Sequence, residues 1–189
     1  MILTGALDVL DMYVDSQKKW VTKYQARKQV EWAGNFVIGK DCLDVGCGRG
    51  VLQALYEKQA KSSRSCDIKD NAWFTVRPDI CSGESLPYAD DSFDTVFMIG
   101  VLEHIPNWQR ALRQAKRVLR PGGVLVTVEP LGLLWEVMNT IPFMPDHIKE
   151  HARWSDVRCS VVNKRRMQPE QKCIIPGLFW GYVYKADKI

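Results

Sequence analysis

The segment best suited to chemistry is a glycine-rich loop that directly follows a short apolar stretch. Cys42–Val45 predicts a buried strand, which leads into the sequence Gly-Cys-Gly-Arg-Gly at Gly46–Gly50 and then into a helix. Glycines let the backbone approach a ligand closely, and in parallel sheets ligands bind outside the carboxyl ends of the strands. The spacing differs from the dinucleotide-binding fingerprint, because Val51 stands where that fingerprint has its third glycine.

Asp44, two residues before the first glycine, narrows the choice of ligand. A carboxylate here would repel the pyrophosphate of a dinucleotide and attract a ligand that bears an ammonium and a sulfonium. S-adenosylmethionine is such a ligand. The loop therefore favours S-adenosylmethionine, while a nicotinamide-dependent oxidoreductase and a glycine turn without a ligand are the alternative interpretations.

Further motifs follow the glycine loop in a fixed order and extend the pattern over roughly residues 42–130. They are Asp79–Tyr88 with Asp91–Asp94, then Val101–Ile105, and then Leu119–Gly123. Together with Leu43–Gly50, this set resembles the class I, seven-strand S-adenosylmethionine-dependent methyltransferases, in particular the branch of quinone-biosynthesis and small-molecule enzymes. The resemblance implies methyl transfer from S-adenosylmethionine, with S-adenosylhomocysteine as product, to an unidentified acceptor that is expected to be a small molecule.

The resemblance assigns one set of residues to the amino-acid end of the cofactor. Asp44 would hold the methionyl ammonium, directly or through water. The loop around it would line the methionyl group, with contributions from Gly46, Cys47, Gly48 and Gly50. Ile99 and Gly100 would place backbone carbonyls beside the same group. Cys47 is expected to fill the loop rather than act as a nucleophile, because the motif supplies no base for it.

A second set would bind the nucleoside end of the cofactor. Asp67, 17 residues after Gly50, would accept hydrogen bonds from both ribose hydroxyls, with Ile68 beside it. Asp79 would accept from the exocyclic amine of adenine, and Ile80 would pack on the ring. The alternatives are a solvated acid at a strand end for Asp67 and a turn or N-cap acid for Asp79.

The reaction implied is an in-line displacement at a methyl group that the positive sulfur already activates, so alignment and desolvation would supply most of the rate. A base is needed only if the acceptor is a hydroxyl or amine, and His104 is the candidate. A structural or cofactor-proximal role for His104 is the alternative, because Glu103–His104 is common to the family.

The acceptor is expected to lie under Leu131–Trp154, which combines many apolar residues with a few polar ones. Trp135, His147 and His151 are predicted to line it, with Trp20 or Tyr24 on the other side, and plain core packing is the alternative. His147–His151 also fits the His-x-x-Glu-His pattern of inverted zinc peptidases, but the pattern has only three fixed positions, and no metal is predicted.

The elements that must position these residues form a single α/β domain spanning 1–189. An N-terminal helical cap (1–39) precedes the cofactor-binding core (40–130), and the acceptor cover with the final strands follows (131–189). Apolar patterns predict a doubly wound, mostly parallel seven-stranded sheet with helices on both faces and an antiparallel last strand. The predicted helices are Ser16–Ala33, one after the glycine loop, and Trp108–Leu119; the further predicted strands are Ser65–Ile68, Phe93–Ile99, Val124–Val128, Val157–Asn163 and Leu178–Lys185.

Composition limits the remaining choices. The net charge of +4 is mild, so the short basic runs near both ends are interpreted as solvated faces and a nucleic-acid partner is not expected. Six scattered cysteines without a Cys-x-x-Cys pair suit a reducing cytoplasm, and the apolar runs are too short for a membrane span. A catalytically inactive binding or regulatory subunit is a further alternative, and a homodimer could close the compact acceptor cover.

Overall fold

A computed structural model describes residues 20–56, 60, 62–70, 77–130, 169–175 and 179–185. Seven strands form one sheet in the order β3-β2-β1-β4-β5-β7-β6. Strands β1 to β5 are parallel, and β7 pairs antiparallel with both β5 and β6. In chain order the strands are Asp41–Val45 (β1), Ser62–Asp67 (β2), Asp79–Ile80 (β3), Phe93–Ile99 (β4), Leu119–Pro130 (β5), Pro169–Ile175 (β6) and Phe179–Lys185 (β7).

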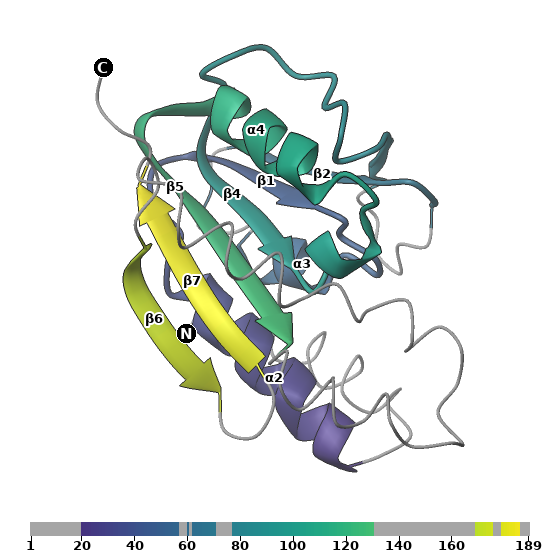
Figure 1. Ribbon diagram of the computed structural model, residues 1–189, viewed down its shortest axis with the longest axis vertical. Helices are drawn as coiled ribbons and strands as arrows, with labels where there is room; N and C mark the ends of the chain where they lie inside the picture. The colour runs from purple at the N-terminus through teal and green to yellow at the C-terminus, as the bar shows by residue number, and fades with distance from the viewer. Residues whose placement is uncertain are drawn as a thin grey trace.

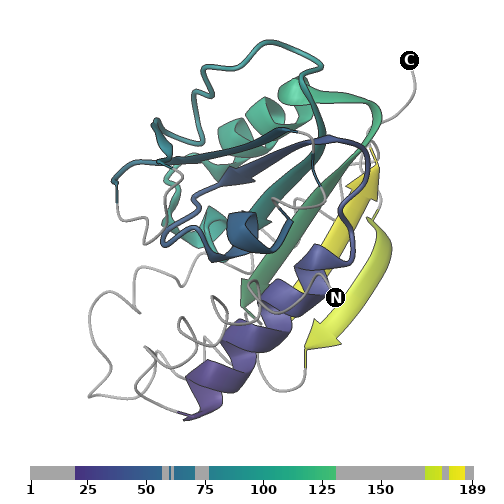
Figure 2. The same cartoon turned by 180° about the vertical axis from the view of Figure 1, so that it is seen from behind.

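Helices lie on both faces of this sheet. Helix α4 covers one face (Figure 1), and α2 and α3 lie on the other (Figure 2). Their bounds are Trp20–Gly34 (α2), Val51–Tyr56 (α3) and Trp108–Val118 (α4), with a short 3₁₀ turn, η1, at Leu102–His104. The predicted doubly wound α/β architecture with an antiparallel last strand is confirmed.

Two apolar clusters, one on each face, hold the helices to the sheet. The cluster under α4 includes Trp108 and Ala115 of the helix and Val96 and Leu125 of the central strands. The cluster under α2 and α3 includes Tyr56, whose ring stacks on Phe97 of β4 with centroids 5.2 Å apart. Because β4 and β5 are buried on both faces, their sequences are nearly continuous in apolar residues, as parallel strands require.

Helix α4 begins where Asn107 caps it and buries one stripe of side chains. The Asn107 side-chain oxygen accepts a hydrogen bond from the Arg110 amide at 3.0 Å, which satisfies one of the free donors of the first turn. Trp108, Ala111, Ala115 and Val118 are buried, in the i, i+3, i+7, i+10 spacing of an amphipathic helix. Arg117 lies away from this buried stripe, and its guanidinium donates hydrogen bonds to two carbonyls of the loop before β4.

Three strand boundaries differ from those predicted. Strand β2 begins at Ser62 rather than Ser65, and its first residues are polar because they lie at the exposed start of the strand. Strand β5 begins at Leu119 rather than Val124, because Arg120–Gly123 forms an irregularity within the strand, where Leu119 pairs with Phe93 and Val124 with Thr95. Strand β6 lies at Pro169–Ile175, and the predicted strand Val157–Asn163 lies outside the described residues.

Charged groups join β1, β4 and β5 at the end of the sheet where β1 begins. Arg120 Nη1 lies 2.7 Å from Asp41 Oδ2 and 2.9 Å from Asp94 Oδ1. Asp94 Oδ2 also accepts hydrogen bonds from the amides of Lys40 and Asp41. Burial alone would raise the pKa of Asp94, but the two amides and Arg120 together lower it below its ordinary value.

Replacing Arg120 by methionine should lower the free energy of unfolding by about 1 kcal/mol at pH 7, since the ion pairs are only partly buried. The pKa of Asp94 is lower in the folded protein than in the unfolded chain. Its contribution to the free energy of unfolding is therefore complete above the pKa of the unfolded chain and is lost as the pH falls through the pKa of the folded protein. The difference from wild type should therefore shrink below about pH 4 in urea denaturation. Arg113→Met, on the exposed side of α4, is the control; an equal loss in that variant would contradict a role for the cluster.

Candidate functional site

The loop after β1 is fixed over the carboxyl end of β2 by backbone hydrogen bonds. The amides of Gly46 and Cys47 both donate to the Cys66 carbonyl, at 2.8 and 3.2 Å. The amide of Gly50 donates to the Cys47 carbonyl at 2.9 Å, which closes the turn into α3. The loop is therefore preformed at the sheet edge where parallel strands end, the place at which such sheets bind ligands.

Different physical constraints act on two glycines of this loop. Gly46 (φ 72°) and Gly48 (φ 52°) both lie in the left-handed region, which disfavours side chains. A Cβ on Gly46 would also overlap the Val101 side chain, whereas a Cβ on Gly48 would meet nothing within 4 Å. Packing against Val101 therefore explains why residue 46 is glycine, whereas the space beside Gly48 is open to a ligand.

Two carboxylates lie beside this loop. Asp44, at the end of β1, is 3% exposed, and burial followed by the charge of Asp67 raises its pKa to about 7. Asp67 ends β2 and accepts from the Gly48 amide at 2.8 Å through Oδ2 and from the Lys69 amide at 3.2 Å through Oδ1. Each Asp67 oxygen has a second lone pair for a ligand donor. The arrangement favours a ligand that brings positive charge to Asp44 and hydroxyl donors to Asp67.

The strand ends next to Asp67 expose two isoleucines. Ile68 and Ile80 are 68% and 61% exposed, and Ile80 pairs in register with Asp67. In the part of the chain that the structure describes, Ile38 is the other large hydrophobic residue that is exposed. Two exposed apolar side chains on neighbouring strand ends form a suitable surface for a flat ring.

Asp79, which begins β3, is bound by side chains from two directions. The Tyr88 hydroxyl donates to Asp79 Oδ2 at 2.8 Å, and Arg64 Nη1 lies 3.4 Å from the same oxygen. The alternative interpretation of Asp79 as an N-cap is wrong, because the residue lies in a strand paired with β2. Tyr88 was not among the predicted site residues, although it lies within the motif Asp79–Tyr88.

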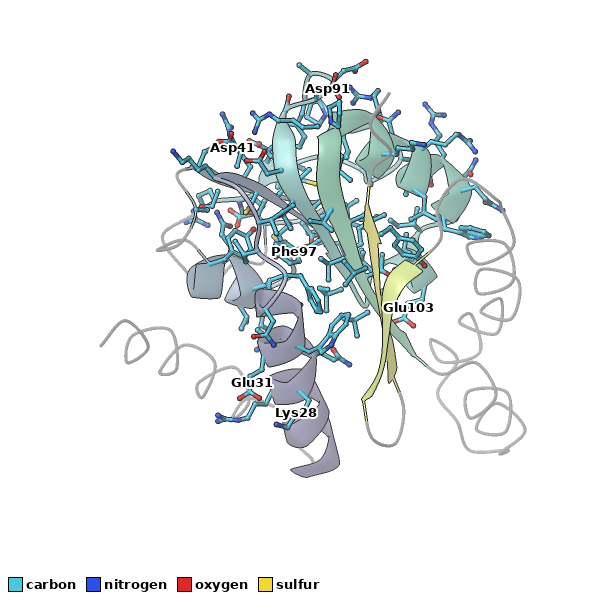
Figure 3. The ribbon with its side chains drawn as sticks, turned by 90° about the vertical axis from the view of Figure 1, so that its left-hand side faces the viewer. Lys28, Glu31, Asp41, Asp91, Phe97 and Glu103 are labelled. Atoms are coloured by element: carbon cyan, nitrogen blue, oxygen red, sulfur yellow. The ribbon has the colours of Figure 1, made fainter. Side chains whose placement is uncertain are left out.

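The end of β4 leads into η1 and the Glu103–His104 pair. Ile99 ends the strand, and Gly100 (φ 59°) follows, its amide donating to the Val128 carbonyl of β5 at 2.7 Å. Figure 3 shows Glu103 at the opposite end of the sheet from Asp41 and Asp91. His104 Nε2 lies 3.4 Å from Glu103 Oε1, and this hydrogen bond raises the pKa of His104. Glu103 Oε2 is buried without a hydrogen-bond partner among the described residues.

Cys47 lies within the loop as predicted, and its environment keeps the thiol protonated. Burial, then the charge of Asp44, raises its pKa to about 12. A thiol with so high a pKa is a poor nucleophile at neutral pH. This agrees with the expectation that Cys47 fills space in the loop.

The predicted acceptor residues Trp135, His147 and His151 lie outside the described residues, and so does the His-x-x-Glu-His pattern. Trp20 and Tyr24 lie in α2, but their side chains are not described. Within the described ranges, no group of three His, Cys, Asp or Glu side chains could hold a metal ion. Likewise, none of the described helices is long and apolar enough to span a membrane.

Comparison with known proteins identifies the domain. Residues 43–127 match a family model described as a methyltransferase domain. The chain is 33% identical over 105 residues to the methyltransferase GfsG of Streptomyces halstedii. This match covers 48% of this chain and 38% of that protein. The chain is 28% identical to the ubiquinone/menaquinone biosynthesis C-methyltransferase UbiE of Bordetella avium (70% of this chain, 59% of that protein) and to the tRNA U34 carboxymethyltransferase of Nautilia profundicola (65% and 43%).

A solved structure supports the same assignment at the level of the fold. The S-adenosylmethionine-dependent methyltransferase of Aquifex aeolicus superposes with a TM-score of 0.62 at 16% identity, over 84% of this chain and 88% of that one. Residues 43–127 are therefore similar to a methyltransferase domain, and the fold is the one that class I S-adenosylmethionine-dependent methyltransferases share. The chain spans 38–59% of the lengths of the three relatives named above.

Replacing Gly46 by alanine should destabilise the unliganded protein by about 2–4 kcal/mol, because the left-handed backbone and the overlap with Val101 both oppose a side chain. Gly48→Ala should lose only about 1 kcal/mol, because it meets backbone strain without overlap. Urea denaturation measures both. The double variant Gly46→Ala/Val101→Ala should recover part of the loss, and equal losses for the two single glycine variants would contradict the packing argument.

Proposed function

We propose that this protein transfers a methyl group from S-adenosylmethionine to a small-molecule acceptor. The observation that supports this best is the pair of carboxylates, Asp44 and Asp67, beside a preformed glycine loop with open space at Gly48. The pair offers negative charge where a methionyl ammonium would bind and acceptors where ribose hydroxyls would bind. A dinucleotide would bring its pyrophosphate towards the same charge, so the nicotinamide alternative is disfavoured.

The roles of the remaining cofactor residues follow from their places along the edge. The loop backbone at Gly46, Cys47, Gly48 and Gly50 would line the methionyl group, with Ile99 and Gly100 at the end of β4 on its other side. Asp67 would bind both ribose hydroxyls. Asp79 would accept from the adenine amine while Ile68 and Ile80 pack on the ring, which would cover the exposed isoleucine side chains.

The chemistry at this edge is a displacement at carbon. When bound, the cofactor would supply a methyl group on a positive sulfur; the acceptor atom would form a bond to that carbon as the carbon–sulfur bond breaks, with S-adenosylhomocysteine as the leaving group. The protein's contribution is alignment, because two reactants held in line react as one molecule. Asp44 and Asp67 would hold the two ends of the cofactor and so set the direction of the methyl group.

A hydroxyl or amine acceptor would also need a group that takes its proton, and His104 is the proposed base. The hydrogen bond to Glu103 raises the pKa of His104, so the neutral imidazole that can accept a proton predominates only at a higher pH than for a free histidine. His104 would otherwise help only to shape the end of β4.

The acceptor class is the least constrained part of the proposal. The relative named for ubiquinone/menaquinone biosynthesis supports a small molecule, whereas the one named for tRNA U34 makes RNA the alternative to be tested. Near the N-terminus, Arg27 and Lys28 of α2 both pair with Glu31 of the same helix, and Figure 3 shows Lys28 beside Glu31. The predicted acceptor cover is still residues 131–154, with Trp135, His147 and His151. Trp20 or Tyr24 of α2 is predicted to lie on the other side of the acceptor.

The affinity for S-adenosylhomocysteine should fall as the pH drops below about 7. Asp44 has a pKa of about 7 in the unbound protein, and a bound ammonium favours its charged form, so binding below this pH must release a proton. We expect a loss of up to about tenfold per pH unit, measured by isothermal titration calorimetry. Asp44→Asn should bind at least about tenfold more weakly at pH 8 and lose this pH dependence.

Asp91→Asn is the matched control for this titration, since Asp91 lies at the opposite end of the sheet and adopts a positive φ that asparagine tolerates. It should retain both the wild-type affinity and its pH dependence. Wild-type binding by Asp44→Asn at every pH would exclude contact between Asp44 and the ammonium.

Asp67→Ala should weaken binding of S-adenosylhomocysteine by at least about tenfold, because it removes a charged acceptor of ribose hydroxyls. Transfer itself is tested by incubating the protein with S-[methyl-³H]adenosylmethionine and separate pools of small metabolites and RNA. Label should enter the small-molecule pool with wild type and fall with Asp67→Ala. Label confined to nuclease-sensitive material would replace the small-molecule acceptor by RNA, and cofactor binding without transfer to either pool would support the non-catalytic alternative.

A further inference from the structure

Tyr88 lies in the loop between β3 and β4 and contacts the proposed adenine-binding acid. Its hydroxyl donates to Asp79 Oδ2 at 2.8 Å, and its half-buried ring packs edge-on against Phe93, with centroids 5.2 Å apart. The other described contact of that oxygen, to Arg64 Nη1, is longer at 3.4 Å and joins side chains that are 59% and 40% exposed. The tyrosine hydrogen bond is therefore the stronger constraint on the Asp79 carboxylate.

The loop that carries Tyr88 is held in place by α4. Arg117 donates to the Leu86 carbonyl at 2.8 Å and to the Tyr88 carbonyl at 2.7 Å, and it pairs with Asp90 Oδ1 at 2.7 Å. Gln114 Oε1 accepts from the Leu86 amide at 3.3 Å. Because the guanidinium is planar and presents several donors in a fixed arrangement, it binds both carbonyls in one geometry. The Tyr88 ring thus has a defined position relative to the sheet.

We propose that Tyr88 is a positioning residue for recognition of the cofactor base, and that it orients Asp79 so that Oδ1 accepts from the 6-amino group of adenine. The inference rests on the proposed function, which places adenine beside Asp79. With Oδ2 engaged by Tyr88, the carboxylate presents one oxygen in a fixed direction. A 6-oxo purine carries an acceptor where adenine carries a donor, so its carbonyl would face a negative oxygen. Tyr88 therefore contributes to selection of adenine over hypoxanthine.

The test compares S-adenosylhomocysteine with its 6-oxo analogue, S-inosylhomocysteine, by calorimetry on wild type and Tyr88→Phe. The phenylalanine keeps the ring that packs on Phe93 and removes only the hydroxyl. Tyr88→Phe should bind S-adenosylhomocysteine about 2–10-fold more weakly, with a smaller change for the analogue, so that the preference for adenine falls by a similar factor. In turnover, the KM for S-adenosylmethionine should rise while kcat changes little, because the methyl group lies at the other end of the cofactor.

A double-variant cycle with Asp79→Asn separates positioning from loop stability. If Tyr88 acts through Asp79, the hydroxyl should contribute little once Asp79 is replaced, and the two losses should not add. Tyr184→Phe, which removes a hydroxyl from a buried tyrosine of β7, should leave the preference for adenine unchanged. Equal weakening of both ligands by Tyr88→Phe, or additive losses in the cycle, would overturn the inference.

The same measurements distinguish this inference from the proposed function. If wild type binds S-adenosylhomocysteine in preference to the analogue and Tyr88→Phe retains that preference, the cofactor assignment stands and the role of Tyr88 is wrong. If wild type binds neither ligand at millimolar concentration, the proposed function fails and the inference fails with it.

Discussion

The hydrogen bond from the Gly48 amide to the Asp67 carboxylate joins the loop after β1 to the end of β2, and the arrangement of the candidate site depends on it. It fixes the orientation of a carboxylate that Lys69 also binds, and it holds the glycine loop in its left-handed turns without a ligand. The Cys66 carbonyl adds two further contacts to the same loop. A site organised before ligand arrives loses less conformational entropy on binding.

The two ends of the sheet have opposite electrostatic organisation. Where β1 begins, Arg120 forms ion pairs with both Asp41 and Asp94. Where β1 and β2 finish, two carboxylates lie close together instead, and the charge of Asp67 adds to the effect of burial in raising the pKa of Asp44. A cationic ligand relieves the repulsion between them, so the fold itself provides a reason for binding at this end.

The fold was largely predictable where one physical pattern dominates. Strand β4 is apolar along its length because both faces are covered, and α4 shows a clear amphipathic stripe, so both were located from the sequence. Strand β6 was missed because it begins Pro-Glu-Gln-Lys, a composition that does not indicate a strand, and only pairing with β7 defines it. The contacts of Arg117 could not be located in this way, because helical periodicity does not show which loop packs beside a helix.

The candidate site was predictable to a similar degree. The glycine loop and Asp67 follow from their place after strands, and the structure brings them together. Tyr88 was missed because its contact with Asp79 depends on how the loop between the two residues folds. The spacing of the two residues in the sequence does not indicate that fold. The acceptor residues Trp135, His147 and His151 stay predictions, since they lie outside the described residues.

The central claim is that the cofactor binds at the carboxyl ends of β1 to β4. Amide hydrogen exchange with saturating S-adenosylhomocysteine tests it directly, because ligand binding slows local opening at the residues it contacts. The account predicts added protection in residues 46–50, 67–69 and 79–81, and none beyond the global effect at the opposite end, in residues 38–41 and 91–94. Protection confined to that opposite end, or no added protection at saturating ligand, would contradict it.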